Sequence, residues 1–117
     1  MIIDRLFESV EKKGNVCVGL DTDLEYLPVE FRNKFMHDEH ALYRFNQMII
    51  DATYDIAACY KVQIAYYEAL GLNGLKVYKD TLSYIKSKEC LAIADIKRGD
   101  IAKTAQMYAK ADRKSVV

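Results

Sequence analysis

The chain has 117 residues, 51% hydrophobic and 29% charged, so it is long and apolar enough to bury a core. Seventeen basic and seventeen acidic side chains give zero net charge, without the basic excess that nucleic-acid binding requires. No apolar run approaches the roughly 18 residues of a membrane span, and the start lacks a signal-peptide pattern. The three cysteines are widely spaced, which argues against a disulfide framework or a zinc site. We therefore expect a cytoplasmic protein that binds neither membrane nor nucleic acid.

The first half of the chain alternates helices with short apolar strands. Apolar residues at three- and four-residue steps predict helices over 2–13 and 40–57. Between these helices, the apolar run 16–20 predicts a buried strand, and the segment 21–38, which carries the only proline, predicts a loop. A second strand is predicted over 59–65.

The second half continues the same alternation after a break predicted at Gly71 and Gly74. The elements predicted to follow are a helix, a strand, a turn and a helix, over 75–88, 91–96, 97–100 and 101–111. Alternating helices and short apolar strands are typical of parallel α/β proteins. We therefore expect a parallel sheet that is covered by crossover helices on both faces.

Charged side chains cluster where the third predicted strand ends. Asp95 and Lys97 are two residues apart, so they project from the same face at the carboxyl end of that strand. Parallel β/α proteins build their active sites at this edge of the sheet. The pair alone is better explained as a solvated ion pair at the end of a strand.

Lys61 favours the functional interpretation. It lies inside the second apolar strand and shares a face with Gln63, and a buried lysine needs an anion beside it. Asp95 on the adjacent parallel strand can supply that anion, although an exposed lysine on an edge strand remains the alternative. Asp21 directly follows the first strand. Alone it fits a turn or a helix cap, but as a third polar group at this edge it is a candidate ligand for a substrate.

Four segments of the chain, in one order, resemble the longer bacterial subgroup of orotidine 5′-phosphate decarboxylases over about residues 1–111. They are Val18-Gly19-Leu20-Asp21, Phe45-Asn46 with Ile50-Asp51-Ala52-Thr53, Tyr60-Lys61 with Tyr66-Tyr67-Glu68, and Ala94-Asp95-Ile96-Lys97-Arg98-Gly99-Asp100-Ile101. Magnesium-dependent keto-sugar-phosphate decarboxylases of the same superfamily share the last motif and are the alternative. Their second strand carries an acid where this chain has Lys61.

The resemblance implies an enzyme without cofactor or metal that converts orotidine 5′-monophosphate to UMP and carbon dioxide in pyrimidine nucleotide synthesis. It also implies four catalytic residues, which are Lys61, Asp95, Lys97 and Asp100. Lys97 would protonate C6 of the pyrimidine as carbon dioxide leaves. Asp95 would lie against the substrate carboxylate, and Lys61 would hold Asp95 and reach the ribose.

Three further residues are implied to bind the substrate, namely Asp21, Ile101 and Thr104. Asp21 resembles the acid that binds the ribose hydroxyls. In the family, Asp100 comes from the other subunit of a homodimer and contacts the ribose, with Ile101 and Thr104 beside it. The resemblance therefore implies a homodimer whose subunits share their active sites.

The fold implied by the resemblance is a TIM (β/α)8 barrel, typically of ~250 residues. Three predicted strands correspond to the first three β/α units, so we expect an incomplete barrel. Residues 1–111 would be the amino-terminal portion of the decarboxylase, and residues 112–117 a divergent tail. We expect such a truncated chain to be inactive on its own. The second hypothesis is a non-catalytic fragment that keeps only a dimerisation surface.

Overall fold

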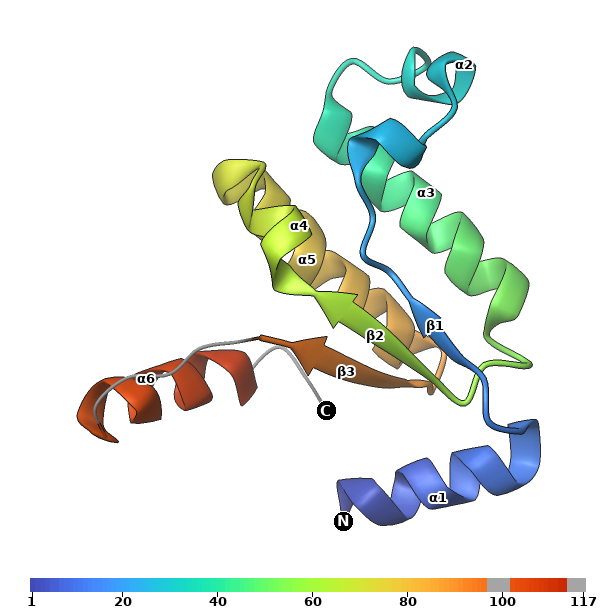
Figure 1. Ribbon diagram of the computed structural model, residues 1–117. Helices are drawn as coiled ribbons and strands as arrows, with labels where there is room; N and C mark the ends of the chain where they lie inside the picture. Colours follow the sequence, from blue (N-terminus) through green and yellow to red (C-terminus); the bar gives the residue numbers. More distant parts are fainter. Residues whose placement is uncertain (97–101, 114–117) are drawn as a thin grey trace.

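Three parallel strands form the centre of the molecule. The computed structural model describes residues 1–96 and 102–113. Strands β1 (Cys17–Gly19), β2 (Cys59–Gln63) and β3 (Leu91–Asp95) form one sheet in this order, and both pairings are parallel. The first residues of the three strands are direct partners. The strands therefore start at the same level and run in the same direction, so that their carboxyl ends lie together (Figure 1).

Helices connect the strands and pack together on one side of the sheet. Helix α3 (Asp38–Thr53) lies between β1 and β2 in the chain, and α4 (Ile64–Glu68) and α5 (Gly71–Ser87) lie between β2 and β3. Helix α5 packs against α3, α4, β2 and β3 (Figure 1). Helix α1 (Ile2–Lys13) precedes β1, and α6 (Ala102–Arg113) follows β3. The predicted order of helices and strands is therefore confirmed.

The loop predicted over 21–38 contains two short helices. A 3-10 helix spans Leu24–Tyr26, and α2 spans Val29–Arg32. The side chain of Asp23 caps the first of these by accepting a backbone N–H two residues later at 3.0 Å. Pro28 is the residue before α2. Aspartate and proline are both common at the start of a helix, so Asp23 and Pro28 could have indicated these two short helices from the sequence.

The core lies between β2 and the helices. Tyr60 and Val62 on β2 are fully buried, and so are Leu42 and Ile50 on α3 and Ile85 on α5. Complete burial of an aliphatic or aromatic side chain of this size stabilises a fold by about 1.5–3 kcal/mol. These contacts hold α3 and α5 against one face of the sheet.

The other face of the sheet is open in the part of the chain that the structure describes. On this face of β2 and β3, Cys59 and Leu91 are buried where the strands begin, whereas the residues further along are half-buried or exposed, and they are Lys61, Gln63, Ile93 and Asp95. In β1, Cys17 and Gly19 are exposed, and their partners in the sheet are Cys59 and Lys61, so they lie on this same face. The predictions of helices on both faces and of a buried first strand are therefore wrong. The β/α units place their helices on one face, as barrels do.

Two predicted boundaries also differ from the structure. The second strand ends at Gln63 and not at residue 65, because the Gln63 side chain accepts the backbone N–H of Ala65 and caps α4. The predicted break does not extend to Gly74, which lies inside α5. A Cβ at this position would overlap the carbonyl oxygen of Tyr67. Glycine therefore allows α5 to approach α4 closely.

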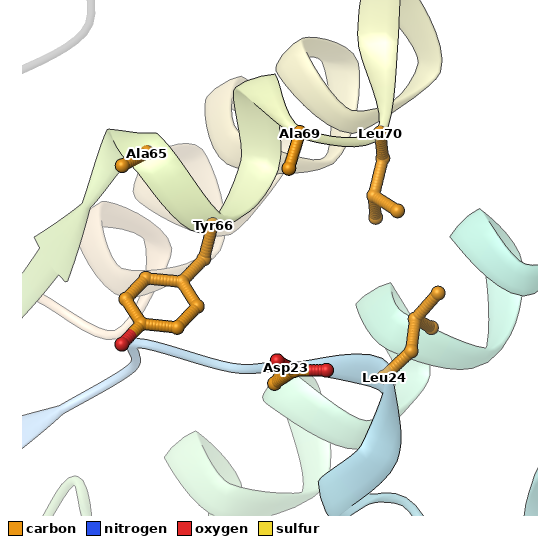
Figure 2. A pocket seen from close by; sticks show the side chains of 6 residues that line it. All are labelled: Asp23, Leu24, Ala65, Tyr66, Ala69 and Leu70. Carbon is orange, nitrogen blue, oxygen red and sulfur yellow. The ribbon is translucent and has the colours of Figure 1, made fainter.

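A pocket of about 230 Å³ separates the segment after β1 from α4. Figure 2 shows Tyr66 extending from α4 towards the chain that follows β1, and Leu70 facing Leu24 across the gap. The residues that line the pocket are Asp23, Leu24, Ala65, Tyr66, Ala69 and Leu70. Because these residues come after β1 and β2, the pocket lies at the carboxyl edge of the sheet.

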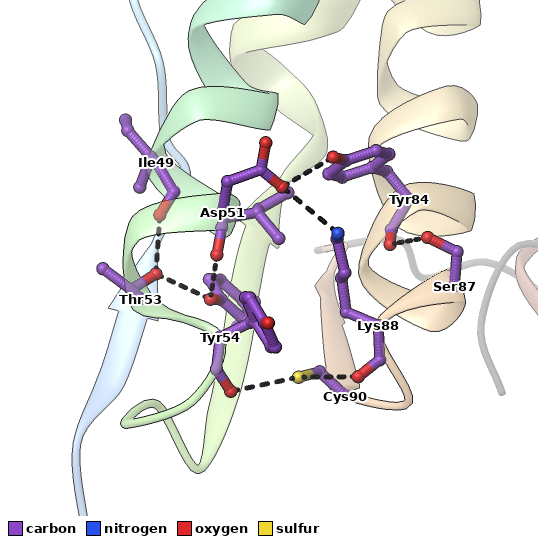
Figure 3. Close-up of polar contacts among 10 residues, drawn as sticks. Ile49, Asp51, Thr53, Tyr54, Tyr84, Ser87, Lys88 and Cys90 are labelled. Atoms are coloured by element: carbon purple, nitrogen blue, oxygen red, sulfur yellow. Dashed lines mark hydrogen bonds and ion pairs between the residues drawn. The ribbon is translucent and has the colours of Figure 1, made fainter.

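A polar cluster ties the end of α5 to α3 (Figure 3). The Tyr84 hydroxyl donates to Asp51 Oδ1 at 2.6 Å, and Lys88 Nζ lies 3.4 Å from the same oxygen. Lys88 Nζ also lies 5.1 Å from the ring centroid of Tyr54 and 5.3 Å from that of Tyr84, within cation–π range. The hydrogen bond from Tyr84, assisted by the charge of Lys88, holds the pKa of Asp51 below its ordinary value.

This cluster predicts how the stability of the chain depends on pH. Because the pKa of Asp51 is lower in the folded chain than its ordinary 3.8, its stabilisation is present above that value and is lost as the pH falls through the folded pKa. Asp51→Asn should therefore lower the melting temperature at pH 7, and this difference from wild type should shrink as the pH falls below 3.8. This difference in melting temperature is measured by thermal unfolding monitored with circular dichroism. A difference that stays the same at every pH would contradict the role given to Asp51.

Candidate functional site

Two neighbouring strands bring Lys61 and Asp95 together, as the sequence predicts. Lys61 Nζ lies 3.7 Å from Asp95 Oδ2. Gln63 is the direct partner of Asp95 in the sheet, and its Nε2 donates a hydrogen bond to the same oxygen at 3.0 Å. The charged pair and the amide that contacts it thus lie on the open face of the sheet.

Gln63 is a site residue that the sequence pattern did not assign. Its Oε1 accepts the backbone N–H of Ala65 at 3.3 Å, so its Nε2 is left to donate to Asp95. The start of α4 thereby orients the amide, and the amide in turn holds the carboxylate. The signal that could have found Gln63 is its position two residues after Lys61, opposite Asp95 on the next strand.

Lys61 is less buried than the sequence predicts. Its side chain is 43% exposed, and that of Asp95 is 23% exposed. The 3.7 Å separation exceeds the 2.7–3.2 Å of an N–H···O hydrogen bond, so the contact is one between charges. Such exposed pairs contribute about 0–1 kcal/mol to stability. The pairing of Lys61 with Asp95 is confirmed, but the fold gains little from it.

Directly after β1, the Leu20 N–H donates a backbone hydrogen bond to the Lys61 carbonyl oxygen at 2.8 Å. Asp21 is the next residue along the chain. Among the described residues, no hydrogen-bond partner is found for its buried Oδ1 atom. A buried acceptor without a donor is costly, so this oxygen is suited to a donor from a ligand. Asp21 lines a cavity of about 430 Å³ together with Gly19, Thr22, Tyr26, Phe45, Ile49 and Tyr66.

Of the remaining predicted site residues, the structure describes only Thr104. Lys97, Asp100 and Ile101 lie outside the described residues. Thr104 is half-buried in the first turn of α6. Figure 1 shows α6 apart from β1 and α3. The structure therefore brings Lys61 and Asp95 together and places Asp21 at the same edge of the sheet, whereas Thr104 is remote from β1.

Neither a metal site nor a membrane-spanning helix is found in the part of the chain that the structure describes. Within residues 1–96 and 102–113, no three histidine, cysteine or acidic side chains lie close enough together to hold a metal ion. His37 and His40, which are three apart in sequence, contact each other edge to face with ring centroids 5.5 Å apart. None of the described helices combines the length and the apolar character needed to cross a bilayer.

Comparisons with known proteins give a consistent result. A model of the family described as "Orotidine 5'-phosphate decarboxylase / HUMPS family" matches residues 14–117. The orotidine 5′-phosphate decarboxylase of Clostridium acetobutylicum is 68% identical over 111 residues, which are 95% of this chain and 39% of that protein. The Clostridium perfringens protein of the same name is 67% identical with the same coverage. The solved structure of Leishmania donovani OMP decarboxylase matches 93% of this chain and 38% of its own, with a TM-score of 0.74 and 28% identity.

These matches show the family of the chain and the share of its relatives' length that the chain covers. The chain spans about 39% of the length of the curated relatives. Its three-strand parallel sheet with helices on one face corresponds to part of an α/β barrel, so the predicted fold class is confirmed. The family model covers most of the chain, and the resemblance drawn from the four motifs is confirmed as well. The chain belongs to the orotidine 5′-phosphate decarboxylase / HUMPS family.

Proposed function

We propose that this chain carries part of the active site of an orotidine 5′-monophosphate decarboxylase, which forms UMP and carbon dioxide. The observation that carries the proposal is the Lys61–Asp95 pair on adjacent strands of the open face. The pair contributes little to stability, so chemistry explains its position better than folding does. Relatives that are 65–68% identical and are named for this activity support the decarboxylase over other members of the superfamily.

The proposed reaction breaks the bond between C6 of the pyrimidine and its carboxylate group. The electron pair of that bond stays on C6, carbon dioxide leaves, and Lys97 donates a proton to C6 to give UMP. The ring offers no position that delocalises the negative charge on C6, so a fixed ammonium group beside C6 would stabilise it electrostatically. Asp95 would face the departing carboxylate, while Lys61 would hold Asp95 and reach the ribose.

Substrate binding would involve residues from two subunits. The buried Oδ1 of Asp21 supports its assignment as the acceptor for a ribose hydroxyl, because this atom needs a donor. In the proposed homodimer, Asp100 of one subunit would contact the ribose bound by the other, with Ile101 and Thr104 beside it. We place this enzyme in the cytoplasm, where nucleotide synthesis takes place, and propose that it needs neither cofactor nor metal.

We expect the 117-residue chain on its own to show no decarboxylation above background. In the described part of the chain the face that carries Lys61 and Asp95 is open to water, which weakens the interaction of fixed charges with a transition state. Loss of the absorbance of orotidylate measures the reaction. Turnover at a rate typical of enzymes would contradict this expectation.

The catalytic assignment can be tested in a longer protein, here named the extended enzyme. It joins residues 1–111 of this chain to the part of the C. acetobutylicum relative that follows the matched region. The extended enzyme should decarboxylate orotidine 5′-monophosphate, and Lys97→Ala should lower its kcat/KM by about 10³-fold or more. That change removes both the proton donor and the ammonium beside C6.

Lys86→Ala is the matched control, since Lys86 is exposed near the end of α5 and takes no part in the proposed site. It should leave kcat/KM within twofold of wild type. Near-normal turnover by Lys97→Ala would overturn the role of Lys97. Absence of turnover in the soluble, folded extended enzyme itself would overturn the proposed function.

A further inference from the structure

A buried polar network next to Asp21 takes no part in the proposed reaction. At its centre is Asn46 on α3, whose side chain is fully buried. Its Oδ1 accepts a hydrogen bond from the Thr22 hydroxyl at 2.8 Å, and its Nδ2 donates to the Tyr67 hydroxyl at 3.0 Å and to Thr81 Oγ1 at 3.2 Å. Well-packed apolar residues can usually replace buried polar groups at little cost in stability. The presence of this network therefore calls for another reason.

The network reaches the chain on both sides of Asp21. The Tyr67 hydroxyl donates to the carbonyl oxygen of Leu20 at 2.7 Å, and Thr22 is bound to Asn46. Side chains from α3 and α4 thus hold the residues immediately before and after Asp21. No partner within the described residues is found for Asp21 Oδ1, so what the chain's own hydrogen bonds fix here is the backbone on either side of Asp21.

The hydrogen-bond donors of the network permit one arrangement. The single proton of the Tyr67 hydroxyl goes to Leu20, so the Tyr67 oxygen can only accept from Asn46 Nδ2. This turns Asn46 Oδ1 towards Thr22, whose hydroxyl must donate. Burial is the main cause that raises the pKa of Tyr67 to about 12, and the hydroxyl therefore keeps its proton at neutral pH. The bonds among Thr22, Asn46 and Tyr67 therefore have one direction.

We propose that Asn46 is a positioning residue, which acts through Thr22 and Tyr67 to hold Asp21 so that its carboxylate meets a ribose hydroxyl of the bound nucleotide. The identity of the ligand rests on the proposed function. The hold on the residues that flank Asp21 does not, because it consists of hydrogen bonds within the chain. Asn46 acts at a distance from the substrate and is not a catalytic residue.

Thr22→Val and Thr81→Val form a matched pair of variants. Both threonines are buried, each substitution exchanges a hydroxyl for a methyl group of similar shape, and each removes one hydrogen bond of Asn46. Thr22→Val frees the backbone next to Asp21. Thr81→Val alters only the end of the network that lies on α5. Thr22→Ser keeps the hydroxyl and provides the conservative rescue.

The first measurement is kcat/KM of the extended enzyme with orotidine 5′-monophosphate. Thr22→Val should lower kcat/KM about tenfold or more, while Thr81→Val should leave kcat/KM within twofold of wild type. The two variants should lose a similar amount of melting temperature. Thr22→Ser should restore kcat/KM to near wild type. Equal effects of the two valine variants, or no rescue by serine in a folded variant, would overturn the proposal.

The second measurement uses the 117-residue chain and needs no ligand. With ¹³C-labelled aspartate, the side-chain carboxyl signal of Asp21 should be single and sharp in wild type and in Thr81→Val, and broadened or split in Thr22→Val. A sharp signal in Thr22→Val overturns the positioning role. If the wild-type extended enzyme is inactive, the proposed function fails, and this second measurement still decides the role of Asn46.

Discussion

Strand β2 has a parallel neighbour on each side, and the rest of the structure depends on these two pairings. Parallel strands must be joined by crossovers, and the chain provides these as α3 and as α4 with α5. Because such crossovers share one hand, their helices come to the same face of the sheet. The two faces of β2 consequently differ: Tyr60 and Val62 are buried against the helices, whereas Lys61 and Gln63 are on the open side.

Polar groups of two kinds meet at the carboxyl edge of this sheet. Asn46 and its partners are buried, and each of their hydrogen bonds is made within the chain. The Lys61–Asp95 pair is partly exposed, and its two charged atoms are too far apart for a hydrogen bond. The first kind fixes the position of the backbone, and the second leaves charge available at the surface. Rigidity and reactive charge are thereby provided by different residues.

The sequence predicted those features that depend on neighbours along the chain or on the next strand. Period-two alternation placed Lys61 and Asp95 on one face, and adjacent β/α units form neighbouring strands, so their contact could be foreseen. Exposure of β1 could not be foreseen, because an apolar strand gives no information on what packs beside it.

Other features depend on contacts between distant residues. Gly74 suggested a break, but it allows α5 to pass close to Tyr67, which only the folded chain reveals. Asn46 lies in a helix predicted from its apolar spacing, and its hydrogen-bond partners are 21 to 35 residues away in the sequence. No local pattern indicates such partners. The polar residues that position a site are therefore harder to predict than those that end its strands.

The proposed function requires that the carboxyl ends of β1, β2 and β3 bind a nucleotide through its ribose and pyrimidine. The most direct test is a crystal structure of the extended enzyme with bound UMP. We predict that a ribose hydroxyl lies within hydrogen-bond distance of Asp21 Oδ1 and that C6 of the pyrimidine faces the side of the sheet that carries Lys61 and Asp95. UMP bound elsewhere, with Asp21 Oδ1 still lacking a donor, would contradict the claim.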